Sequence, residues 1–152
     1  MKFISKIHGL LVKIGRLLQT PVLLVIRLYW GWEFLLTGKG KLQHLDRTTK
    51  FFTSLNIPAP HLNAIMASST ECACGILLLL GLFSRFASAA LICVMSVALY
   101  TADHDAVVGI FNDPDKFLAT DPFLFLYAAV IVFCFGPGKV ALDTFVFKDE
   151  PV

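Results

Sequence analysis

Four stretches of the chain are apolar enough, and nearly long enough, to be helices that cross a membrane. They cover about residues 21–37, 64–82, 86–102 and 118–135, and each is followed by a segment with glycine, proline or charged residues. A spanning helix needs about 20 predominantly apolar residues. The pattern therefore predicts an all-α fold, an integral membrane four-helix bundle formed by a single domain over residues 1–152.

The first 19 residues follow a different pattern, with basic residues on one side of a helix and apolar residues on the other. At 100° per residue the basic side chains fall within about 40° of one line; they are Lys2, Lys6, Lys13 and Arg16. The opposite side carries Phe3, Ile7, Leu10, Ile14 and Leu17. A helix of this kind lies in the membrane interface. We therefore expect residues 1–19 to form an amphipathic interfacial helix peripheral to the bundle, with packing against the bundle as the alternative.

Two polar connections separate the spans on one side of the predicted bundle. Residues 38–63 contain basic residues and a short helical pattern from Leu45 to Leu55, and residues 103–121 are acidic. Because these connections follow the first and third spans, both emerge on the same side. Their opposite charges predict that they fold over one end of the bundle as a lid above an apolar cavity. With the N-terminus inside, seven basic residues lie on the cytoplasmic side and five outside, so the positive-inside rule favours a cytoplasmic N-terminus.

Composition places the chain among membrane proteins and excludes several other classes. Hydrophobic residues make up 57% of the chain and charged residues 16%, with a mean hydropathy of +0.74, whereas soluble domains are about a quarter charged. A net charge of +2 is too small to indicate a nucleic-acid partner. Cys72 and Cys74 would point about 200° apart on a helix and cannot bridge each other. No C-x-x-C pair occurs, which counts against disulfide redox chemistry. We expect all four cysteines to be packed thiols, and we expect no metal site.

The first two predicted spans contain the ionisable residues Arg27, Glu33 and Glu71, and of these Arg27 and Glu71 are the main candidates for chemistry. A charged residue at the centre of a span costs at least about 2.5 kcal/mol, so it normally has a partner and a function. Arg27 lies in the first span and Glu71 in the second. Each shares a helical stripe with small residues that let helices approach closely; these are Gly31, Gly38 and Gly75. We expect Arg27 and Glu71 to lie at similar depth and to pair. The pair could line a pocket for a polar ligand such as a quinone headgroup, or it could be a structural ion pair that fixes helix register.

Three further residues are candidates for the rim of such a pocket. Lys41 lies on the Arg27 stripe, either over the pocket mouth or as a lysine that extends to the lipid headgroups. His104 stands between Asp103 and Asp105, which fits either a solvated loop end or a hydrogen-bond donor beside Tyr100 at the outer mouth. Consecutive residues rarely chelate one ion, so these residues do not indicate a metal centre.

Several motifs together resemble the DoxX family. The first span has Arg27-Leu28-x-x-Gly31-x-x-Phe34-x-x-x-Gly38-x-x-Lys41-Leu42, and the second has Glu71-x-x-x-Gly75 followed by Leu80-Gly81-Leu82-x-x-Arg85. The closing segment Gly136-Pro137-Gly138 with Leu142-Asp143 also matches. Asn56 departs from the pattern, because it stands where glycine is common in the family loop. The resemblance covers about residues 21–143 and leaves the basic N-terminal helix outside it.

The resemblance implies a multi-pass protein of the cytoplasmic (inner) membrane. Members and relatives are linked to quinone-coupled sulfur oxidation, including the membrane subunit of thiosulfate:quinone oxidoreductase. The resemblance therefore implies that the chain is a subunit in quinone-linked redox chemistry, with a bound quinone but no intrinsic cofactor. The sequence has no haem, iron–sulfur or flavin motif, so a partner subunit would supply the redox centre. The alternative is a non-catalytic accessory subunit of a larger membrane complex. A small transporter is a weaker third possibility, since neither an inverted repeat nor broken helices are evident.

Overall fold

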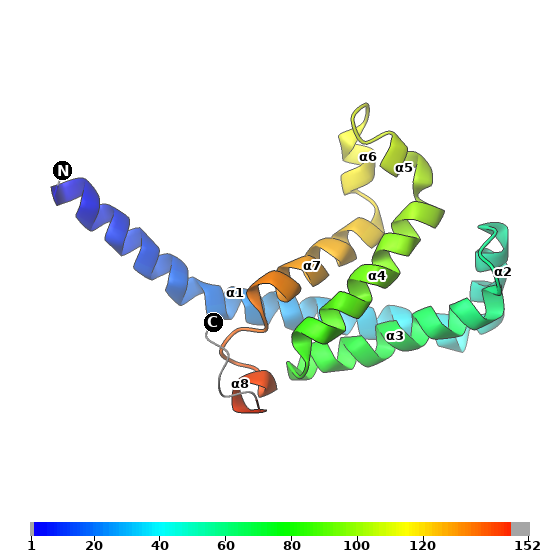
Figure 1. The fold of residues 1–152 in the computed structure, drawn as a ribbon, viewed down its shortest axis with the longest axis horizontal. Helices are drawn as coiled ribbons and strands as arrows, with labels where there is room; N and C mark the ends of the chain where they lie inside the picture. The colour runs from blue at the N-terminus through cyan, green and yellow to red at the C-terminus, as the bar shows by residue number, and fades with distance from the viewer. Residues whose placement is uncertain (1, 147–152) are drawn as a thin grey trace.

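The part of the chain that the structure describes folds into helices joined by short connections (Figure 1). The structure is a computed structural model that describes residues 2–146, with side chains from residue 7 onward. The longer helices are α1 (Lys2–Gln43), α3 (Pro60–Leu80), α4 (Ser84–Ala102) and α7 (Asp121–Phe135). The shorter ones are α2 (Leu45–Ser54), α5 (His104–Val108), α6 (Pro114–Leu118) and α8 (Leu142–Val146). The predicted all-α class is confirmed.

The core is formed where the four longer helices meet. Helix α1 packs on α3 and α7, and α4 packs on the same two helices. Each contributes one large buried residue to a shared cluster, which contains Phe34, Leu78, Leu91 and Val132. By length and composition α3, α4 and Ile7–Gln43 of α1 can each cross a membrane, whereas α7 has only 15 residues. The described residues thus contain three membrane-capable helices, and a fourth span remains a prediction.

Helix α1 is longer than the sequence pattern predicts at both ends. We expected a break between residues 19 and 21 and an end at Thr37, but one helix runs from Lys2 to Gln43 and includes Pro21. Proline removes one hydrogen bond from a helix and can kink it without ending it. Gly38 does not end the helix because it packs directly against α3. Packing there outweighs the low helix propensity of glycine, about 1 kcal/mol. Whether residues 1–19 lie on a membrane surface stays a prediction.

The two polar connections do not meet as a common lid. The predicted short helix is present as α2, which packs against α3 and α1. The acidic connection forms α5, which packs on α4, and α6, which packs on α7. Figure 1 shows α2 well apart from α5 and α6. The predicted shared lid is therefore wrong, because charges on exposed loops are screened by water and salt.

Candidate functional site

The site is built on a close approach of the backbones of α1 and α3. A Cβ atom added at Gly38 would lie 2.7 Å from the amide nitrogen of Cys72, and one added at Gly75 would lie 2.7 Å from that of Leu35. No larger residue fits at either position without moving a helix. The small-residue stripes seen in the sequence therefore form the contact between these two helices.

This contact fixes the antiparallel register of α1 and α3. Gly38 lies against the turn that runs from Ser68 to Cys72, and the Arg27 guanidinium lies against Gly81. Glu71 is ten residues from Gly81, which is roughly 15 Å along a helix. The expected pairing of Arg27 with Glu71 is therefore wrong. The predicted depths were misplaced because α1 continues beyond Thr37, so that Lys41 lies closer to Glu71.

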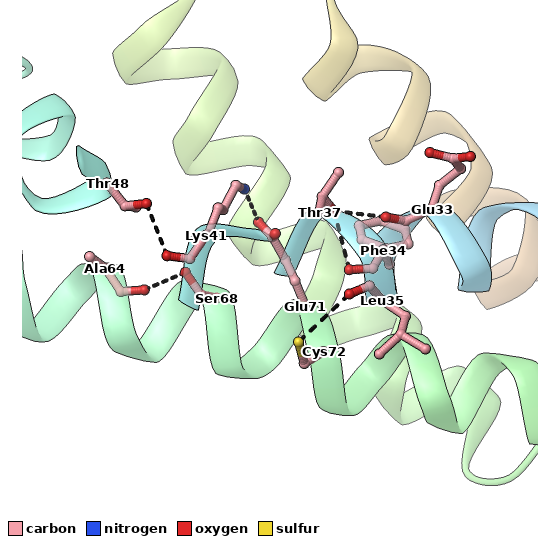
Figure 2. A network of polar contacts seen from close by, with 10 residues as sticks. All are labelled: Glu33, Phe34, Leu35, Thr37, Lys41, Thr48, Ala64, Ser68, Glu71 and Cys72. Atoms are coloured by element: carbon pink, nitrogen blue, oxygen red, sulfur yellow. Dashed lines mark hydrogen bonds and ion pairs between the residues drawn. The ribbon is translucent and has the colours of Figure 1, made fainter. Parts of the chain in front are cut away.

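Lys41 is the partner of Glu71 (Figure 2). Its Nζ atom lies 2.6 Å from Oε1 of Glu71. The Glu71 side chain is only 1% exposed, whereas that of Lys41 is 39% exposed. Lys41 lies one turn beyond Gly38, near the end of α1, so its charged group can reach both the buried carboxylate and the surface. We call the contact between α1 and α3 the seam. The Lys41–Glu71 pair connects this seam with the protein surface.

The second carboxylate oxygen of Glu71 is buried and has no hydrogen-bond partner in the described part of the chain. Nearby hydroxyl groups donate to backbone carbonyls instead, as Figure 2 shows. Thr37 donates to the carbonyl of Glu33 at 2.8 Å and Ser68 to that of Ala64 at 2.7 Å. Thr48 of α2 donates to the carbonyl of Lys41 at 3.2 Å. The Thr37 hydroxyl also lies close enough to interact with the Glu71 carboxylate, but Oε2 accepts no hydrogen bond from the described residues and can take one from a ligand.

Arg27 lies at the opposite end of the same seam, against Gly81. It is 3% exposed, and its guanidinium donates to the carbonyls of Pro137 and Val140 at 2.9 and 2.8 Å. Its Nε is buried without a partner among the described residues. These bonds hold the segment after α7 against α1. Gly136 and Gly138 turn that segment with φ values of 76° and 79°, a conformation that favours glycine.

Asp143 completes this end of the molecule, and the sequence pattern did not single it out for this role. Its carboxylate accepts the amide hydrogens of Phe83 and Ser84 at 2.6 and 2.9 Å. It therefore caps the first turn of α4 from a distant part of the chain. Its own amide donates to the carbonyl of Gly81 at 2.8 Å. Together Arg27 and Asp143 fasten the C-terminal segment over the turn between α3 and α4.

Tyr100 and His104 lie elsewhere, on the exposed side of the end of α4. Tyr100 is 67% exposed, and its ring meets that of His104 edge to face at a centroid distance of 5.3 Å. His104 lines a shallow polar depression of about 370 Å³ together with Asp103, Asp105 and Lys116. The buried face of α4 instead presents residues such as Leu99. The expected arrangement, with Tyr100 and His104 under a lid above Glu71, is therefore wrong.

Of the predicted site residues, the structure thus brings Lys41 and Glu71 together in the buried contact between α1 and α3, and Tyr100 and His104 together at the exposed surface. Lys41 was a candidate because it continues the Arg27 stripe, but the sequence alone did not select it as the partner. In the described part of the chain, no group of three His, Cys, Asp or Glu side chains is placed to hold a metal ion. All four cysteines are free thiols.

Comparison with known proteins identifies the family of the chain. The model of the DoxX family matches residues 22–104, which is more than half of the chain. An uncharacterized protein of Haemophilus influenzae is 26% identical over 133 residues, which cover 85% of each chain. No solved structure matches the chain.

Proposed function

The chain belongs to the DoxX family of multi-pass membrane proteins, and on this premise we propose that it is a subunit in quinone-linked redox chemistry. The Lys41–Glu71 pair would bind the quinone headgroup. The redox centre would belong to a partner protein. We further propose that α7 completes the bundle as a fourth, short span in the cytoplasmic membrane, with the N-terminus in the cytoplasm.

The observation that carries this proposal is the unused carboxylate oxygen of Glu71 beside a half-exposed lysine. A quinone has two carbonyl oxygens, which become hydroxyl groups when it takes up two electrons and two protons. The Lys41 ammonium can donate a hydrogen bond to one oxygen of the oxidised headgroup. Oε2 of Glu71 can accept one from the reduced form. The pair therefore suits both states of the ligand and lies where protons can arrive from the surface.

A second candidate function, an accessory subunit without a ligand, is favoured by Arg27. This residue is equally buried, yet its guanidinium donates hydrogen bonds to backbone carbonyls. The same seam thus uses one buried charge to hold the fold together. If Lys41 and Glu71 serve only that purpose, the protein contributes structure to a larger membrane complex.

Quinone binding to the purified protein separates the two candidates. A short-chain ubiquinone and the corresponding ubiquinol are each titrated into protein in detergent and followed by quenching of Trp30 and Trp32 fluorescence. Hydrogen bonds to charged groups contribute about 1.5–3 kcal/mol, so Lys41→Met should weaken binding of the oxidised form, and Glu71→Gln binding of the reduced form, roughly tenfold or more. Lys39→Met and Glu33→Gln are the matched controls, because they change the same residue types outside the pair, and should leave affinity unchanged.

Two results would contradict the quinone proposal. If the unaltered protein shows no saturable binding, or if all four variants bind alike, the quinone proposal fails. Stoichiometric recovery with a large complex from native membranes, without quinone, would then support the accessory function.

A further inference from the structure

The N-terminal part of α1 packs against no other element among the described residues. Residues 7–19 are all exposed, and Figure 1 shows this part of the helix extending away from the other elements. At 1.5 Å per residue, the 42 residues of α1 measure about 63 Å. The hydrocarbon core of a bilayer is about 30 Å thick. About half of α1 therefore lies outside the hydrocarbon if the remainder crosses it.

An apolar stripe runs without interruption from this extension onto the spanning part of the helix. At 100° per residue Ile14, Leu18, Val25, Trp32 and Leu36 fall within about 40° of one line, and all five are between 43% and 65% exposed. In the spanning part this stripe is the side that faces away from the other helices. It is therefore the side that contacts lipid in a membrane.

The basic residues of the extension lie on the other side. Lys13 and Arg16 fall in line with Arg27, Gly31 and Gly38, the side of α1 that packs against α3 further along. The chain has no acidic residue before Glu33. The extension is thus a purely cationic amphipathic helix, and its apolar side continues the lipid-facing side of the span.

Pro21 stands where the extension meets the span. Proline has no amide hydrogen, so the hydrogen bond to the carbonyl of Leu17 is missing and the helix bends more easily at this point. The match to the DoxX family model begins at residue 22, immediately after this proline. The extension therefore lies outside the matched region and is joined to it at a position that allows a change of direction.

We propose that residues 2–20 bind the surface of a bilayer rich in anionic lipid, with the apolar stripe in the acyl chains. The ammonium of Lys13 and the guanidinium of Arg16 contact lipid phosphates. Lys2 and Lys6 lie on the same side of the helix by their sequence positions. Apolar burial and attraction to anionic headgroups together determine the affinity of such helices for membranes.

The test uses the full chain in liposomes, with Cys72, Cys74, Cys93 and Cys134 replaced by alanine. One fluorophore is attached at Leu10→Cys, on the apolar side, or at Gly9→Cys, on the basic side. A side chain at residue 9 meets no other atom within 4 Å. Quenching by spin-labelled lipid and by aqueous iodide is measured in vesicles with and without phosphatidylglycerol.

In vesicles with phosphatidylglycerol we expect the label at residue 10 to be quenched by lipid and shielded from iodide, and the label at residue 9 to show the reverse. Each basic residue near an anionic surface contributes about fivefold in binding. Reversing both charges with Lys13→Glu and Arg16→Glu should therefore lower the ratio of bound to free helix more than 25-fold. The double variant Lys39→Glu and Lys50→Glu, which makes the same charge change at exposed positions, should have no effect.

Three results would overturn the proposal. Free access of iodide to residue 10 would show an extension in water. Equal lipid quenching in neutral and anionic vesicles would remove the role of the headgroups. A label at residue 10 that is shielded from both quenchers would show that protein covers the stripe, and crosslinking would then identify a second copy of the chain as the cover.

Discussion

Arg27 and Glu71 are both ionisable residues buried in the contact between α1 and α3, but they have different partners. Arg27 is 3% exposed and Glu71 1%. Arg27 donates to two backbone carbonyls of the segment after α7. Glu71 instead binds the ammonium group of Lys41, which four methylene groups link to the backbone. The Lys41 side chain is 39% exposed.

The difference lies in whether the partner can move away. Backbone carbonyls are positioned by the fold, so Arg27 cannot exchange them for a ligand without releasing the C-terminal segment. A lysine side chain can rotate toward water, and Glu71 keeps one oxygen unpaired in the described structure. Equal burial therefore does not imply an equal role. Arg27 has the contacts of a structural residue, whereas Glu71 has those of a residue able to bind something else.

The largest effect is expected from Arg27→Met. This change leaves the carbonyls of Pro137 and Val140 without donors, and each hydrogen bond to a charged group is worth about 1.5–3 kcal/mol. We expect a loss of about 3–6 kcal/mol in the free energy of unfolding in detergent. Limited proteolysis should also cleave earlier between residues 137 and 146. Arg16→Met, at an exposed position, is the matched control. A variant that keeps both its stability and its protease resistance would show that Arg27 does not hold this segment.

A smaller and asymmetric effect is expected from the two members of the Lys41–Glu71 pair. Lys41→Met strands a buried carboxylate, and removing one partner of a buried pair costs about 3–5 kcal/mol, less where the carboxyl group takes up a proton. Glu71→Leu should cost only about 1 kcal/mol, because Lys41 can turn into water.

The double variant Lys41→Met with Glu71→Leu tests whether the two residues act as a pair. It should be more stable than Lys41→Met alone in thermal unfolding, since no buried charge is left without a partner. Equal losses for the two single variants, with no recovery in the double variant, would contradict this arrangement.

The smallest effect is expected for the coupling energy between Arg27 and Glu71. Arg27 and Glu71 are roughly 15 Å apart along the seam, so a double-mutant cycle of Arg27→Met with Glu71→Leu should be additive within about 0.5 kcal/mol. The cycle of Lys41→Met with Glu71→Leu serves as the positive control. A coupling energy above about 1 kcal/mol between Arg27 and Glu71 would mean that the two ends of the seam communicate.

Local sequence determined the positions of the long helices α3 and α4 and the sides on which α1 and α3 contact each other. Apolar length predicted the positions of α3 and α4 to within a few residues, and turn residues predicted the end of α2. The glycine stripes predicted a close contact between the first two long helices, which Gly38 and Gly75 provide. These features depend on neighbouring residues and on helical periodicity, so they are visible in the chain itself.

Only the tertiary structure decided which charges meet. The choice between Arg27 and Lys41 as the partner of Glu71 depends on the register of α1 against α3. Because Arg27 lies opposite Gly81, pairing it with Glu71 would require a shift of about ten residues, which is roughly 15 Å. Register results from the sum of all contacts along the seam, including the fit of Gly38 beside Cys72. The sequence therefore identified Glu71 as a buried group that needs a partner, whereas the packing of two backbones selected Lys41.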